Sequence, residues 1–427
     1  MQARGRDGCG RAGAFLPRIS LVAGLWAGHQ GAMTTHTRPR TAPPNPWLVL
    51  AGLSLGVLVT NGLARFAYSL ILPAMRNDLG WSYAQAGWLN TANAMGYILG
   101  ALGTMMALRW ISPNRLFSVG LITTVLAITA TGVLPDLWWQ SLWRFLTGGA
   151  GALSFATAGT LAARLFADDP KRSALGIGIL FGSGGGTAIM LIGATLPPML
   201  GAWGDAAWPW AWVITGGIGA LCLPLGLWSA RATRTPRAPI PTSGPLPWRR
   251  MLPELAGYAG FGLGYIVYLT FLSAWMAEQD ASTLQVALVW VLLGLCITLS
   301  PLIWRGVFAR HSGGRPLAMV LTAIALGSAL PVLWPGLGGL LVSALVFGGS
   351  VFMAPPAITT FTRRNLPAES WGRAISLFTV VFAVAQTIGP YAAGILGDYA
   401  GSIGASLLAA SALLLIGAGI ALRQRSL

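Results

Sequence analysis

Long apolar stretches alternate with short polar breaks from Trp47 to Leu422. A transmembrane helix needs about 20 predominantly apolar residues, and stretches of this length recur along the whole chain. The pattern predicts an all-α integral membrane protein with twelve transmembrane helices. The predicted spans are residues 47–71, 84–106, 116–134, 138–166, 173–200, 209–230, 251–276, 284–304, 317–334, 337–361, 374–397 and 402–422.

The longest interior break, residues 231–250, is rich in arginine and proline and contains no acidic residue. Such a segment cannot cross the membrane. It predicts a cytoplasmic linker between an N-terminal bundle, 47–230, and a C-terminal bundle, 251–422. Residues 1–46 are expected to form a disordered basic tail, with Met33 as an alternative start, and residues 423–427 a cytoplasmic C-terminal tail.

The two halves of the chain resemble each other at an offset of 200 residues. The matches are Gly62, Leu63, Tyr68, Leu72 and Ala74 with Gly262, Leu263, Tyr268, Leu272 and Ala274; Gly148, Gly149, Thr160 and Arg164 with Gly348, Gly349, Thr360 and Arg364; and Arg115 with Arg315. Internal repeats are typical of secondary transporters, whose substrate sites lie between the repeats near the membrane midplane. The repeat predicts two pseudo-symmetric six-helix bundles.

Composition supports the membrane assignment, because 55% of the residues are hydrophobic and only 9% are charged, against roughly 25% charged in soluble domains. The net charge of +16 would suit a nucleic-acid partner, but its distribution does not. Apart from Arg65, Arg76 and Arg144, every basic residue falls on one side of the predicted bundle. The positive-inside rule then predicts a multi-pass protein of the bacterial inner membrane, with both termini cytoplasmic and no nucleic-acid partner.

Two arginines fall inside predicted spans, Arg65 in the outward half of the first and Arg144 in the outer half of the fourth. A charge inside the membrane is costly and by default indicates function. Either side chain could instead cap helix carbonyls or extend to the outer headgroups. Asn61, Arg65 and Tyr68 follow i, i+4, i+7 spacing and should share one helix face.

No carboxylate lies well inside any predicted span to neutralise these arginines. A guanidinium holds a carboxylate through two parallel hydrogen bonds. We therefore predict a small anionic substrate, bound by Asn61, Arg65, Tyr68 and Arg144 from the first bundle.

Span 7 contributes an aromatic stripe, in which Tyr258, Phe261, Tyr265 and Tyr268 fall on one helix face. Such a stripe serves helix packing or lines a ligand cavity, and the hydroxyls of Tyr265 and Tyr268 favour the cavity. Gln386 in span 11 either reaches the same cavity or bonds a neighbouring helix. The repeated glycines Gly178, Gly182 and Gly186 in span 5 predict close helix packing.

Other kinds of chemistry lack a sequence signal. Cys9, Cys222 and Cys296 are widely separated, so they support neither a disulfide framework nor a metal site. The methionines show no repeated spacing of the kind that a copper importer needs. No phosphate-binding loop is present, which disfavours an ATP-driven pump, and no nucleophile–base pair suggests an enzyme. We expect no cofactor.

Two segments resemble the major facilitator superfamily. Residues 144–151, RFLTGGAG, are similar to the RxxxG pattern of its fourth helix, and residues 306–315, GVFARHSGGR, are similar to its signature cytoplasmic loop. The resemblance implies two bundles that rock about a central site, with Arg115, Gly306, Gly313 and Arg315 in loops that govern the movement. The usual acid of the signature loop is missing, because Arg310 occupies its position, so a gating scheme built on that acid is not carried over.

Further segments resemble the YbfB/YjiJ branch of that superfamily. They are GLARF at 62–66, GWL at 87–89 with Asn93 and Gly96-Tyr97, FGLGY at 261–265 with TFL at 270–272, and FGG at 347–349 with Phe352-Met353. The resemblance implies a monomeric permease embedded in the lipid bilayer, in which a proton is a candidate coupling ion. A multidrug-type exporter and a non-transporting membrane sensor or assembly factor stay open as alternatives.

Overall fold

In the part of the chain that the structure describes, the helices form twelve membrane-length segments, of which the first and the tenth are irregular. The structure is a computed structural model that describes residues 45–166, 170–233 and 246–427. The described helices of the first half are α1 Pro46–Val57, η1 Leu58–Leu63, α2 Ala64–Leu79, α3 Tyr83–Ala107, α4 Pro113–Thr131, α5 Leu137–Leu165, α6 Pro170–Trp203, η2 Asp205–Ala207 and α7 Trp208–Ala232. Those of the second half are η3 Trp248–Met251, α8 Leu252–Glu278, α9 Thr283–Arg310, α10 Arg315–Leu333, α11 Leu337–Val351, α12 Ala354–Asn365, η4 Ala368–Ser370, α13 Trp371–Ala400 and α14 Gly404–Ala421.

Every predicted span corresponds to one of these segments, so the all-α twelve-span fold is confirmed. Ten helices among the described residues are long and apolar enough to cross a membrane. The remaining two, α3 and α5, are less apolar because they carry buried polar side chains. These include Asn90, Asn93, Gln140 and Arg144. Residues 1–44 of the predicted tail, including the alternative start at Met33, and linker residues 234–245 lie outside the described residues.

The first span differs most from its prediction. It was expected to end at residue 71, but the helix continues through Pro73 to Leu79 and ends at Gly80, whose φ of +64° suits glycine. Its middle is a π-helix, Leu58–Leu63, that joins α1 to α2 without interruption. π-Helical turns are rare and are frequently found at functional sites.

The tenth span is interrupted at Phe352 and Met353, between α11 and α12. Pro355 and Pro356 follow directly in the first turn of α12. A proline lacks the N–H that would continue the helix and clashes with the preceding turn. Two shorter helices therefore replace the single predicted one.

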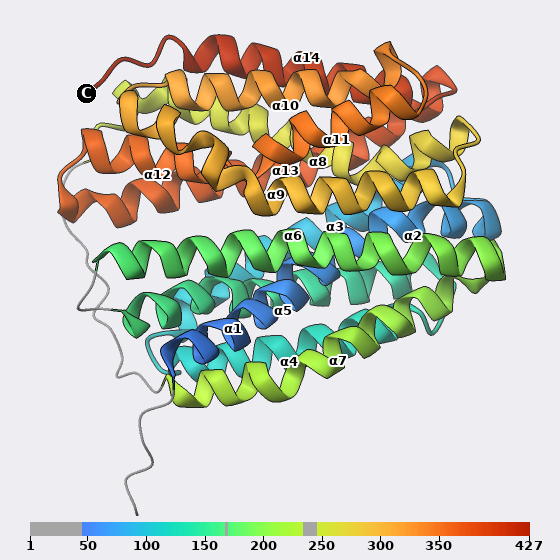
Figure 1. The fold of residues 1–427 in the computed structure, drawn as a ribbon, viewed down its shortest axis with the longest axis horizontal. Helices are drawn as coiled ribbons and strands as arrows, with labels where there is room; N and C mark the ends of the chain where they lie inside the picture. Colours follow the sequence, from blue (N-terminus) through green and yellow to red (C-terminus); the bar gives the residue numbers. More distant parts are fainter. Residues whose placement is uncertain (1–44, 167–169, 234–245) are drawn as a thin grey trace, which may run out of the picture. The chain divides into compact units, whose positions relative to one another are not determined.

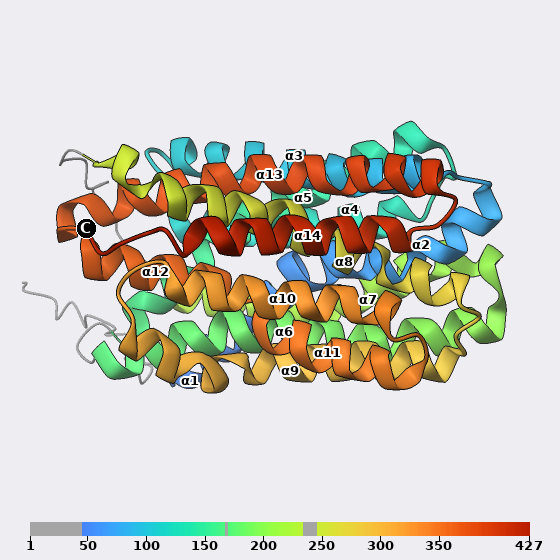
Figure 2. The same cartoon turned by 90° about the horizontal axis from the view of Figure 1, so that it is seen from above.

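The two halves form two helix groups that lie side by side (Figure 1). Within the first group, α3 packs on α5 and α4 packs on α5 and α7; within the second, α14 packs on α8 and α10, and α11 packs on α9 and α10. The groups meet along three helix pairs, α2 with α8, α3 with α13, and α6 with α9. Figure 2 shows α13 beside α3 and α9 beside α6.

Helix starts repeat the 200-residue offset. α3 begins at Tyr83 and α9 at Thr283, and α5 begins at Leu137 and α11 at Leu337. Ser82 with Gln85 and Ser282 with Gln285 form equivalent capping boxes at the first of these pairs. The sequence repeat therefore corresponds to a structural repeat. The predicted glycine packing holds at Gly186, which lies against Gly294 and Thr298 of α9, but not at Gly178, where a Cβ would meet no atom within 4 Å.

Candidate functional site

Arg65, Gln386 and Tyr265 meet where the two helix groups adjoin. Arg65 lies near the middle of the continuous helix Pro46–Leu79, and its Nη2 donates a hydrogen bond to Gln386 Oε1 of α13. The Tyr265 hydroxyl of α8 donates to the same oxygen at 3.0 Å. Arg65 is 9% exposed and Gln386 is fully buried. Three residues that the sequence singled out in separate spans are thus in contact.

Two hydrogen-bond donors at this meeting point lack an acceptor. Nε of Arg65 and Nε2 of Gln386 are buried without a hydrogen-bond partner. Because two donors converge on Gln386 Oε1, the amide oxygen must face them and the amide nitrogen must face elsewhere. A buried donor without an acceptor costs about 1–3 kcal/mol. The site is therefore suited to a ligand that supplies acceptor oxygens.

The described partners of Arg65 are neutral groups. Its Cζ lies 5.7 Å from the ring centroid of Tyr97 on α3, and its hydrogen-bond partner is the neutral amide of Gln386. Neither Asp nor Glu from the described residues forms an ion pair with it. A buried cation in this position attracts an anion, because water cannot screen the interaction there.

Arg144 has a different environment, although it is also buried. Its Nη1 donates to the Ala64 carbonyl at 2.6 Å and its Nη2 lies 3.4 Å from Asn90 Oδ1. Its Cζ lies 5.0 Å from the ring centroid of Tyr68 and 5.6 Å from that of Trp212. These contacts join α5 to α2, α3 and α7 inside the first group. They match the carbonyl-capping alternative for this arginine.

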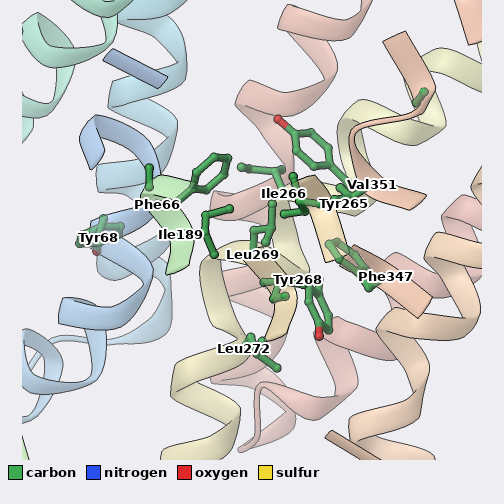
Figure 3. Close-up of a cluster of buried hydrophobic side chains, with 14 of the residues drawn as sticks. Phe66, Tyr68, Ile189, Tyr265, Ile266, Tyr268, Leu269, Leu272, Phe347 and Val351 are labelled. Atoms are coloured by element: carbon green, nitrogen blue, oxygen red, sulfur yellow. The ribbon is translucent and has the colours of Figure 1, made fainter. Parts of the chain in front are cut away.

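Tyr68 and Tyr268 also bond within their own helix groups. The Tyr68 hydroxyl donates to the Ala86 carbonyl at 2.7 Å, and the Tyr268 hydroxyl lies 2.7 Å from Ser343 Oγ. Figure 3 shows the hydroxyls of Tyr265 and Tyr268 pointing in opposite directions, with Tyr68 set apart from both. Of the predicted tyrosines, only Tyr265 reaches Arg65 through a shared partner.

The predicted common face of Asn61, Arg65 and Tyr68 holds only in part. Asn61 is half-buried and lies inside the π-helix, whose i→i+5 bonding departs from the 3.6-residue period behind the prediction. Arg65 reaches α13, whereas Tyr68 packs on Trp212 of α7 with ring centroids 6.3 Å apart.

An aromatic wall lies next to Gln386, formed by Tyr258, Phe261 and Tyr265 of α8 and Phe382 of α13. The Phe382 ring is stacked on the other three at centroid distances of 5.4, 5.5 and 5.6 Å. Phe261 and Tyr265 stack at 4.5 Å. The predicted stripe on span 7 is thus a stack of three rings joined by Phe382. Tyr268 is not part of it, because its ring stacks on Phe347 at 3.8 Å.

One face of α13 leads to this site. Ile375, Thr379, Phe382 and Gln386 follow i, i+4, i+7, i+11 spacing, and their exposure falls from exposed at Ile375 and Thr379, through half-buried at Phe382, to buried at Gln386. Val384 and its neighbours on the opposite face are about half exposed and apolar, as expected toward lipid. The exposed residues on this face, Ile375 and Thr379, lie toward the end of the bundle at which α13 begins.

The opposite end of the bundle is closed by contacts between the two groups. Asp398 near the end of α13 accepts hydrogen bonds from the backbone N–H groups of Tyr83 and Ala84, at 2.7 and 2.8 Å. The Tyr83 hydroxyl donates to Glu278 at the end of α8, and the guanidinium of Arg76 lies over the Tyr83 ring at 3.8 Å. A carboxylate at a helix N-terminus is favourable, so Asp398 joins α13 to α3.

Of the four residues predicted to lie in loops that govern the movement, three lie in helices. Arg115 lies in the first turn of α4, Gly306 lies within α9, and Arg315 begins α10. Gly313 lies against the Gln424 carbonyl of the C-terminal tail. The loop carbonyls are instead held by Arg364 of α12, which donates to His311 and Ala309 at 2.8 and 2.9 Å.

Phe382, Tyr97, Asn90 and Glu254 are not among the site residues predicted from the sequence. Phe382 lies one helical turn before Gln386, and Asn90 is a buried amide in a membrane span, so spacing and polarity were available signals. Glu254 is 1% exposed, and both of its carboxylate oxygens lack a hydrogen-bond partner. It is the only carboxylate among the buried side chains of the described part of the chain.

A known protein family matches most of this chain. Residues 57–422 match a family model described as "Uncharacterised MFS-type transporter YbfB". The chain belongs to this family. It is therefore a multi-pass membrane transporter of the major facilitator type, as the resemblance of its motifs indicated. No curated protein matches the chain.

Solved structures with the same fold are distant in sequence. A bacterial homologue of the human lysosomal transporter Spinster, in an inward-facing and unoccupied conformation, has a TM-score of 0.66 at 17% identity, covering 89% of this chain and 97% of that one. A POT family transporter in complex with a thioalcohol-conjugated peptide has a TM-score of 0.68 at 12% identity, with coverages of 87% and 95%. The nucleoside transporter NupG has a TM-score of 0.63 at 12% identity, with coverages of 88% and 96%. These likenesses establish the fold of this MFS-type transporter.

Proposed function

We propose that this MFS-type transporter carries a small organic anion across the bacterial inner membrane by alternating access. The substrate binds between the helix groups at Arg65, Gln386 and Tyr265, near Asn61. Arg144, Tyr68 and Tyr268 hold the surrounding helices in place. The protein acts as a monomer, without a cofactor.

The observation that carries this proposal is the environment of Arg65. It is a buried guanidinium at the junction of the groups, its described partners are neutral, and two nearby donors lack acceptors. A carboxylate would supply the missing negative charge and the missing acceptor oxygens together. Alternating access is supported by the arrangement of the groups, which are joined by Asp398 at one end and leave the α13 face exposed at the other.

The distribution of charge supports an orientation. The open end, at which α13 begins, carries the basic loops and the closed end carries the acidic residues Asp398 and Glu278. From the positive-inside rule we propose that the open end and both termini are cytoplasmic. The proposed state is inward-facing. Two coupling schemes fit this proposal: a proton enters bound to the substrate anion, or one anion is exchanged for another without a proton. The buried carboxyl group of Glu254 could also hold a coupling proton.

The test is a thermal-shift screen of the purified protein against small carboxylates, neutral compounds and cations, followed by uptake into proteoliposomes. A ligand that binds only the folded state raises its stability by mass action. We expect carboxylates to raise Tm and Arg65→Gln to abolish the effect. Arg109→Gln, the same change at an exposed loop arginine, should leave it intact.

The alternatives are distinguished by the same experiment. Uptake of cationic dyes that survives in Arg65→Gln would favour a multidrug exporter and contradict the proposal. Binding of an anion without any flux into proteoliposomes would favour a sensor or assembly factor.

A further inference from the structure

A stack of aromatic rings lies beside Arg65 Nε and Gln386 Nε2, the two donors without an acceptor. Binding of an anion would not by itself require these rings. The aromatic wall, Tyr258, Phe261, Tyr265 and Phe382, includes the residue that shares Gln386 with Arg65, namely Tyr265. The four rings are close to parallel, with interplanar angles of 17° to 29°. Phe382 is half-buried, whereas Tyr258, Phe261 and Tyr265 are buried. Phe382 is therefore the ring of the wall that a ligand arriving along α13 would touch first.

Tyr97 of α3 supplies a further half-buried ring beside Arg65. The guanidinium accordingly has an aromatic ring on the α3 side and an amide attached to the aromatic wall on the α13 side. An aromatic ring that packs on another gains about 0.5–1.5 kcal/mol beyond the burial of its area. An aliphatic anion would not gain this term.

The charge of the ligand is limited by Arg144. Arg144 is completely buried and already has the Ala64 carbonyl and Asn90 as partners. It cannot reach a ligand beside Gln386 without losing these contacts. Arg65 is therefore the one guanidinium available to pair with the ligand, and a ligand with a single negative charge complements it.

We infer that the substrate is an aromatic monocarboxylate, with its carboxylate on Arg65 and Gln386 and its ring against Phe382 and Tyr97. This inference rests on the proposed function and narrows it. Gln386 Nε2 and Arg65 Nε donate to the two carboxylate oxygens. The ring extends along the α13 face toward Thr379.

The test compares three probes of similar size on the purified full-length protein: benzoate, cyclohexanecarboxylate and benzamide. Benzoate should bind about threefold to tenfold more tightly than cyclohexanecarboxylate, which has the charge but no aromatic ring. Benzamide, which has the ring but no charge, should not raise Tm. Phe382→Leu should reduce the difference between the two carboxylates while both still bind, and Phe382→Tyr should keep it.

The outcomes separate this inference from the proposed function. Equal affinity for benzoate and cyclohexanecarboxylate in the unmodified protein overturns the aromatic preference and leaves the anion transporter in place. Failure of every carboxylate to raise Tm, while neutral or cationic compounds do so, overturns both. An undiminished preference in Phe382→Leu also contradicts the inference, because the ligand ring would then not pack on Phe382.

Discussion

At the scale of single residues, Arg65 and Arg144 are the same chemical group in two different roles. Arg144 contacts a carbonyl, an amide oxygen and two ring faces, all within its own helix group, although its Nε, like that of Arg65, has no hydrogen-bond partner. Arg65 reaches across to the other group and stands beside unpaired donors. The first arrangement stabilises the fold, whereas the second is suited to binding.

Arg144→Lys should therefore destabilise the protein. Lysine keeps the charge but cannot bond Ala64 and Asn90 through a planar fork or stack on Tyr68. Loss of hydrogen bonds to a buried charged group costs about 1.5–3 kcal/mol, so Tm measured in detergent should fall. Arg65→Lys should change Tm far less but weaken carboxylate binding. Equal losses of Tm in the two variants would contradict this division of roles.

At the scale of helices, α3 and α13 approach so closely at the closed end that only glycine fits. A Cβ at Gly394 would collide with the Tyr83 carbonyl, and one at Gly87 would collide with that of Pro390. Close packing of this kind lets backbones touch without lipid or water between them. Bulk introduced there must push the two helices apart.

Gly394→Val should for this reason shift the protein away from the observed state. We expect the closed end to open and the exposed end to close, so that a cysteine at Thr379, with the native cysteines replaced, reacts several-fold more slowly with a maleimide. Gly103→Val is the matched control, because a Cβ at Gly103 of α3 meets no other atom within 4 Å. Identical labelling rates in both variants would show that this contact does not hold the state.

At the scale of the whole molecule, the two groups are fastened at one end by a few polar contacts. Across the groups, Asp398 accepts hydrogen bonds from two N–H groups at the start of α3 and Glu278 accepts one from the Tyr83 hydroxyl. Within its own group, Glu278 also accepts from Ser402 and the Ile403 N–H. A charge at a helix N-terminus contributes about 0.3–1 kcal/mol, and up to ~2 kcal/mol when partly buried. At the upper end of this range, about 1–2 kcal/mol, a two-state equilibrium shifts by a factor of about 5 to 30.

Asp398→Asn should accordingly populate a state open at the acidic end. Spin labels at Trp210 and Tyr399, which are 59% and 89% exposed on different groups, should show a longer distance population than in the parent protein. Asp136→Asn removes a comparable helix cap, at Trp139, but within the first group. It should leave the distance unchanged. A longer distance in both variants would indicate general loosening instead of release of this contact.

The number, order and approximate ends of the spans follow from the sequence, because apolar length is a local property and the 200-residue repeat supports it. The exceptions are local as well, where Pro73 is accommodated within a helix and Pro355 and Pro356 break one. Which buried polar side chains meet could only be decided by the tertiary structure. Arg65 and Gln386 lie 321 residues apart in the sequence. Helix packing sets how each helix is rotated about its axis, and this rotation brings Arg65 and Gln386 together. The same packing directs Tyr68 and Arg144 toward the interior of the first helix group.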